Sequence, residues 1–119
     1  MNHFAMYGKL TARPGQRDAL ADILLEAADL LKSNNDCYLY IVNVSDDDPN
    51  AVYVTELWKD ADAHAASLKN EEVLASIQRG RSLIIGAEPI KLRALGEKAC
   101  RVMMQLLLPL QPITRLLLS

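Results

Sequence analysis

Apolar and polar residues follow two different spacings along residues 1–95, one typical of strands and one typical of helices. Residues 4–12 and 37–44 are short runs rich in apolar, β-branched and aromatic side chains, which predicts two strands. A polar loop at 45–50 and a third strand at 51–58 follow, so the second and third strands are expected to form an antiparallel hairpin. Residues 90–95 mostly alternate apolar and basic side chains, which is typical of a strand with one solvent-facing side.

A helical repeat lies between the first two strands. Apolar residues recur there at spacings of three and four, which predicts one apolar stripe: Leu20, Ile23, Leu24, Ala27 and Leu31. The turn Pro14-Gly15 precedes this helix, and the polar run 33–36 is expected to end it.

The second helical region is expected in two pieces. A short helix over 61–68 begins after Asp60, and a longer one begins after Asn70, because Asp and Asn are good N-caps. The longer helix is expected to end at Gly86. Its predicted buried side comprises Val73, Leu74, Ile77 and Ile84.

The order of elements is therefore β-α-β-β-α-β. This predicts an α+β, ferredoxin-like fold with a four-stranded sheet and both helical regions on one face. The other sheet face would be bare and apolar, so a second copy of the chain is expected to cover it, as in a dimeric α/β-barrel. We expect one domain over 1–96 and a C-terminal apolar arm over 97–119.

The arm combines a narrow polar stripe with many apolar residues. Lys98, Arg101 and Gln105 recur at helical spacing, which predicts an amphipathic helix followed by a Pro-interrupted segment. The helix is expected to pack on its own subunit or on the partner, while an interfacial membrane or partner-binding segment and a tail without a role stay open. Two prolines and Arg115 exclude a membrane span.

Composition narrows the class of protein. Half of the 119 residues are hydrophobic and the net charge is −2, which argues against nucleic-acid binding. Cys37 and Cys100 stand far apart without zinc-ligand spacing, and the N-terminus carries no secretion signal. We therefore expect free thiols, no metal site and a cytoplasmic location.

Three segments resemble the antibiotic-biosynthesis monooxygenase family. Residues 8–15 (Gly-Lys-Leu-Thr-Ala-Arg-Pro-Gly) resemble its first strand and turn, and the loop at 46–51 also fits. Residues 55–60 (Thr-Glu-Leu-Trp-Lys-Asp) and the helix at 63–68 resemble its Glu-x-Trp and helix signature. The resemblance spans about residues 5–95 and is greatest to the quinol monooxygenase-like subgroup.

The resemblance implies an oxidoreductase that uses no cofactor. Its substrate would be a small phenolic or quinol-like aromatic that, once deprotonated, reduces molecular oxygen directly. The protein would supply a dry cavity, a base and hydrogen bonds to the substrate anion. A non-catalytic ligand-binding or stress-response dimer and a small-carbonyl isomerase stay open. Haem degradation is not expected, because residues 71–85 contain no His.

Three residues of the signature are candidate catalytic groups. His64 is the candidate base because its ordinary pKa lies near neutral pH, although a surface role stays open. Trp58 would wall the cavity and donate to a substrate oxygen, or serve only in the core. Glu56 would orient one of them, act as a base or tie strand to helix. Many relatives have a second His where this chain has Ser67.

Three further residues are candidate substrate contacts. Tyr40 and Asn43 lie on the second strand, where the face that lines a cavity is not evident from the sequence. Arg81 lies on the later helix and would hold a substrate anion, or belong to a solvated helix face.

Overall fold

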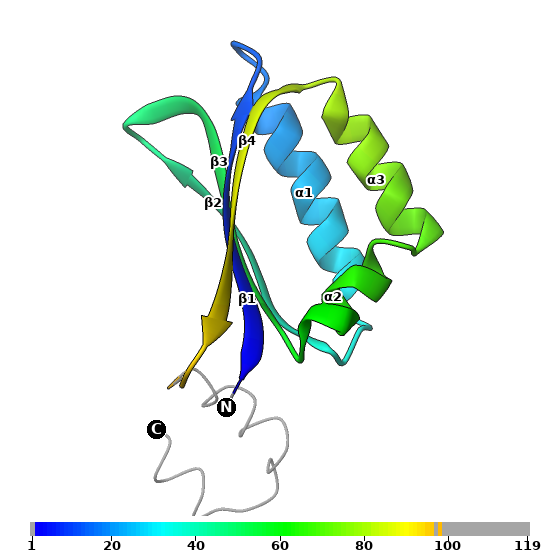
Figure 1. Cartoon of the computed structure of the whole chain (residues 1–119). Coiled ribbons are helices and arrows are strands. Elements are labelled where there is room, and N and C mark those ends of the chain that lie inside the picture. The colour runs from blue at the N-terminus through cyan, green and yellow to red at the C-terminus, as the bar shows by residue number, and fades with distance from the viewer. Residues whose placement is uncertain (1, 97, 99–119) are drawn as a thin grey trace, which may run out of the picture.

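The computed structural model describes residues 2–96 and 98, which form a four-stranded sheet with three helices on one side (Figure 1). The strands are β1 (His3–Ala12), β2 (Cys37–Ser45), β3 (Asp48–Trp58) and β4 (Ile84–Ala94). The helices are α1 (Arg17–Leu31), α2 (Ala61–Ser67) and α3 (Glu71–Arg81). The predicted arm at 97–119 lies outside the described residues except for Lys98.

The strands lie in the order β2-β3-β1-β4, and every neighbouring pair is antiparallel. This is the predicted ferredoxin-like arrangement, with the second helical region in two pieces. The core lies between sheet and helices, where Ala12, Leu20 and Val52 are fully buried. The space between the sheet and this layer of helices is therefore where a buried site can form.

Strand register places two rows of side chains across the helix-side face. Partners that lie opposite one another in a sheet point to the same face. The first row is Tyr40, Glu56, Met6 and Lys91, one residue from each strand in spatial order. The second row contains Trp58, Phe4 and Arg93.

Within residues 2–96, no helix lies on the other sheet face (Figure 1). Large apolar side chains on this open face are 41 to 50% exposed: Tyr7, Ile41, Ile90 and Leu92. The rings of Tyr7 and Tyr53 stack there with centroids 6.2 Å apart. A row of Ile, Leu and Tyr side chains is therefore available for contact over this face.

The predicted end of the second helical region was wrong. Helix α3 ends at Arg81, and β4 already begins at Ile84. The backbone N–H of Arg13 donates to the Leu83 carbonyl at 2.8 Å, and Ile84 pairs with Ala12. Pairing with the end of β1 thus draws this apolar run into the sheet, although its spacing also fits a helix.

Two smaller expectations also need correction. Leu74 is 39% exposed, so it does not belong to the buried side of α3. The hairpin turn is confined to residues 46–47, because β2 reaches Ser45 and β3 starts at Asp48. The side chains of Ser45 and Asp48 accept backbone N–H bonds at 3.2 and 3.1 Å, which stabilises a tight turn in place of the expected six-residue loop.

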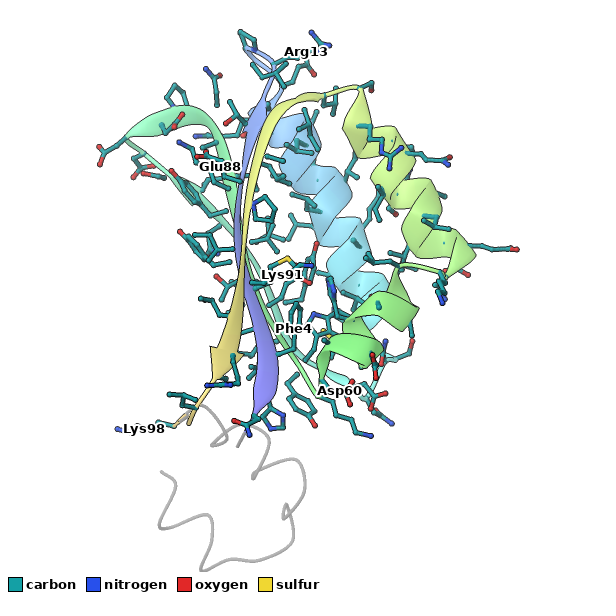
Figure 2. All side chains as sticks on the ribbon, in the orientation of Figure 1. Phe4, Arg13, Asp60, Glu88, Lys91 and Lys98 are labelled. Carbon is teal, nitrogen blue, oxygen red and sulfur yellow. The ribbon has the colours of Figure 1, made fainter. Side chains whose placement is uncertain are left out.

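The predicted caps of α2 and α3 are confirmed. Asp60 accepts the backbone N–H of Ala63 at 2.7 Å, and Asn70 accepts those of Glu72 and Val73. The cap at Asp60 begins α2 directly after β3, at the foot of the helical layer in Figure 2. No helix in the described part of the chain is long and apolar enough to cross a membrane.

Candidate functional site

A cavity of about 130 Å³ lies between the sheet and the three helices. Most of its wall is aliphatic and comes from α1 and α3. Its polar or aromatic wall includes four residues that the sequence singled out: Tyr40, Glu56, Trp58 and His64. An apolar cavity of about 150 Å³ is enough for one benzene ring, so this space matches a single aromatic ring.

Trp58 and Glu56 form a hydrogen-bonded pair on β3. Side chains two residues apart on a strand share a face, and the Trp58 Nε1–H donates to Glu56 Oε1 at 3.0 Å. Trp58 is 1% exposed, so its indole is part of the cavity wall. Burial raises the pKa of Glu56, and the indole bond offsets part of that rise. The indole N–H therefore serves Glu56 in this arrangement and is not a free donor to substrate.

His64 lies on α2 against the same pair. Its Nε2 is 3.8 Å from Glu56 Oε1, beyond hydrogen-bond distance but close enough for strong attraction when the ring is protonated. Its ring packs on Phe4 at 5.0 Å and edge-on to Trp58 at 5.3 Å. Burial, and then the positive charge of Lys91, lower the pKa of His64. The imidazole is therefore favoured as a neutral group that can accept a proton.

The side chain of Tyr40 lines the cavity, and its hydroxyl is available for a hydrogen bond. It lies beside Glu56 in the sheet, and no described residue forms a hydrogen bond with its hydroxyl. Burial and the nearby Glu56 charge raise its pKa, so the hydroxyl keeps its proton and can donate. Burial also raises the pKa of the free thiol of Cys37 to about 11, which makes it a poor nucleophile at neutral pH.

Asn43 and Arg81 do not join this cluster. Asn43 lies on the open face, where its Nδ2 donates to the Tyr53 carbonyl at 3.2 Å and to Thr55 Oγ1 at 3.4 Å. Arg81 is exposed at the end of α3 and does not line the cavity. The side chains of Tyr40 and Asn43 point to opposite faces because they lie three positions apart on one strand.

Ser67 lies one turn beyond His64 on α2. It lines the cavity, and its hydroxyl donates to the His64 carbonyl at 2.6 Å. This bond stabilises the last turn of α2 and so helps to hold His64. The sequence did not identify Phe4 as a neighbour of His64, because the position of Phe4 depends on the pairing of β1 with β3. Among the described residues, no group of three His, Cys, Asp or Glu gathers as a metal site.

Comparison with known proteins shows which family this chain resembles. The family model of antibiotic biosynthesis monooxygenases matches residues 3–79. A Chloroflexus aurantiacus structure, provisionally assigned as an antibiotic biosynthesis monooxygenase, is 37% identical, with a TM-score of 0.75 over 82% of this chain and 97% of that one. SnoaB, a cofactor-independent oxygenase from Streptomyces nogalater, shares the fold at 15% identity, with a TM-score of 0.72 over 83% of this chain and 99% of its own. The sequence has no match among curated proteins. The chain belongs to the antibiotic biosynthesis monooxygenase family.

Proposed function

We propose that the chain is a cofactor-independent monooxygenase of a small phenolic or quinol-like aromatic. Family membership supports monooxygenase chemistry in general. The observation that carries the finer proposal is that His64, Glu56 and Tyr40 surround a cavity of about 130 Å³ that is otherwise mostly apolar. A one-ring substrate would there meet a base, a hydrogen-bond donor and little water.

The proposed reaction begins with proton transfer from a substrate hydroxyl to His64. The anion then passes electrons to molecular oxygen, and a new C–O bond forms at the ring. One oxygen atom stays on the product, which becomes a quinone, and the other leaves as water with two hydrogen atoms from the substrate. The substrate itself supplies all the electrons, so the step requires no metal or flavin.

The neighbours of His64 have distinct supporting roles in this proposal. Glu56, 3.8 Å from His64 Nε2, would stabilise the imidazolium that forms when the proton arrives. Trp58 would hold the Glu56 carboxylate through its 3.0 Å bond and wall the cavity. Tyr40 would donate its free hydroxyl to the substrate oxygen on which negative charge develops.

We further propose that two copies of the chain associate through their open sheet faces in the cytoplasm. The exposed Tyr7, Ile41, Ile90 and Leu92 support this, because monomers rarely leave a continuous apolar patch in water. Neither the dimer nor the location is needed for the proton transfer at His64. The dimer is tested separately, by sedimentation.

Oxygen uptake with methylhydroquinone, a one-ring quinol, tests the reaction. The rate above the protein-free background is compared for the wild type, His64→Ala and the matched control His3→Ala, whose residue lies outside the cavity. Loss of a general base costs roughly 10²-fold or more, so His64→Ala should lose nearly all of the catalysed rate while His3→Ala keeps it. Equal rates for His64→Ala and the wild type would remove His64 as the base.

Non-catalytic binding of a small ligand is the second candidate. The mostly aliphatic wall of the cavity favours it, because such a wall binds an aromatic ring without any chemistry. Quenching of Trp58 fluorescence by methylhydroquinone without any catalysed oxygen uptake would support binding over catalysis. An isomerase acting on a small carbonyl compound would consume its substrate with no oxygen uptake.

A further inference from the structure

Two cations lie beside the candidate site without an assigned role. Lys91 and Arg93 are consecutive helix-side residues of β4, since the residue between them, Leu92, points to the open face. Both are exposed. Within the described residues, neither side chain forms an ion pair or a hydrogen bond.

Strand register places these cations next to His64. Lys91 ends the row that contains Glu56, with only Met6 between them, and Arg93 is the direct neighbour of Phe4, whose ring contacts His64 at 5.0 Å. Neighbouring strands lie about 4.8 Å apart, so the backbone of β4 runs about 10 Å from that of β3. A long Lys or Arg side chain can cross much of that gap. The Lys91 charge lowers the pKa of His64, which is consistent with their closeness.

No acidic side chain of β4 lies on the helix side with these two cations, and both cations are exposed to solvent. Helices α1 and α2 pack on the other three strands, whereas β4 has its main contacts with β1. The only acidic residue of β4, Glu88, lies on the open face, while Lys91 lies on the helix side (Figure 2). The site therefore consists of an apolar cavity for a ring and two solvated cations to one side of it.

We infer that the substrate is an anionic aromatic, a phenol or quinol whose ring also carries a carboxylate that Lys91 and Arg93 bind. The ring would occupy the cavity, while the carboxylate would stay outside it, because an unpaired charge in an apolar cavity is very costly. Arg binds carboxylates in a bidentate manner and Lys adds a compact point charge. The inference rests on the proposed function for the position of the ring in the cavity. It concerns the binding of the substrate and not its oxidation.

Binding of 4-hydroxybenzoate and its methyl ester tests this inference. The two ligands differ in charge but share the phenol, and the quenching of Trp58, the only Trp of the chain, reports both. Charged hydrogen bonds contribute about 1.5–3 kcal/mol, so the acid should bind at least about tenfold more tightly than the ester. Lys91→Gln and Arg93→Gln together should abolish this preference without weakening the ester.

Matched variants distinguish a local carboxylate site from a general effect of positive charge. Arg81→Gln and Lys69→Gln remove one charge each at exposed positions away from the cavity and should leave the preference intact. Lys91→Arg keeps the positive charge and should retain most of the preference for the acid. Equal binding of acid and ester by the wild type, or an unchanged preference in the double variant, would overturn the inference. Preferential binding of the acid without oxygen uptake on any quinol would instead refute only the proposed function.

Discussion

At the scale of single residues, His64 lies between a carboxylate and a cation that act on it in opposite directions. Glu56 would favour its protonated form, whereas burial and Lys91 favour the neutral form and prevail. The result is an imidazole that is neutral near pH 7 beside a carboxyl group that can stabilise it after proton transfer. A base needs this combination to take a proton and later release it.

The titration of His64 should show this balance directly. We expect its pKa, measured from the imidazole C2–H signal by NMR, to lie below the ordinary 6.5. It should rise in Lys91→Gln, because that change removes a positive charge. The contribution of His64 to protein stability should fall as pH drops below 6.5, since the unfolded chain then binds the proton more readily, and should level off below the folded pKa. A pKa above 6.5, or no rise in Lys91→Gln, would contradict this account.

Glu56→Gln should separate stability from function. Burial raises the pKa of Glu56, so the wild type should lose stability as pH rises from 4.5 through the folded pKa, where the carboxyl must ionise inside the protein. Gln keeps an acceptor for the Trp58 indole but cannot ionise. The variant should therefore be at least as stable as the wild type at pH 8 in urea unfolding, yet oxidise methylhydroquinone more slowly. Glu88→Gln, at an exposed position, is the matched control.

At the scale of elements, the position of His64 depends on how α2 and α3 begin and end. Side-chain caps at Asp60 and Asn70 start both helices, and Gly80 brings α3 close to α1. A Cβ added at Gly80 would meet Leu20 Cδ1 at 3.6 Å, an ordinary contact distance. Gly80 therefore permits close packing without being strictly required for it.

Two glycine substitutions should have opposite effects on stability. Gly80→Ala should stabilise the fold by about 0.5–1 kcal/mol, because Ala favours a helix interior and the space admits a methyl group. Gly15→Ala should destabilise it by about 1–2 kcal/mol, because φ at Gly15 is +80° in the turn before α1. Urea unfolding of both variants tests this. A loss of stability in Gly80→Ala would mean that α3 packs on α1 too tightly to admit a methyl group.

Sequence reasoning predicted elements well where the signals are local and poorly where they are not. The caps at Asp60 and Asn70 depend on neighbours two or three residues away, so the sequence alone sufficed. The end of α3 depends on Ala12 and Arg13, some seventy residues distant, and no local pattern reveals that pairing. For the same reason, alternation placed Glu56 and Trp58 on one face, whereas the nearness of Lys91 to His64 required the strand order.

At the scale of the whole molecule, one sheet face holds the cavity and the other is open. Both faces carry apolar side chains, but the helices of the described part of the chain cover only one of them (Figure 1). A second copy of the chain would bury the open face and leave the cavity in each subunit intact. We therefore expect association and ligand binding to depend on different residues.

Charge on the open face should dissociate the dimer. We expect the wild type to sediment as a dimer at micromolar concentration and Ile90→Lys to sediment as a monomer, because a Lys would be placed in an apolar interface. Leu25→Lys is the control, since Leu25 is similarly exposed, at 51% against 50%, but lies on α1. A monomeric wild type, or a dimeric Ile90→Lys, would argue against association through this face.

The central claim is that this chain inserts one atom of molecular oxygen into an aromatic ring at the His64 cavity. The most direct measurement is turnover of methylhydroquinone under ¹⁸O₂, with the product analysed by mass spectrometry for the wild type and His64→Ala. The account predicts a hydroxylated quinone that carries one ¹⁸O atom, formed by the wild type and nearly absent with His64→Ala. A product without ¹⁸O, or equal labelling by both proteins, would contradict it.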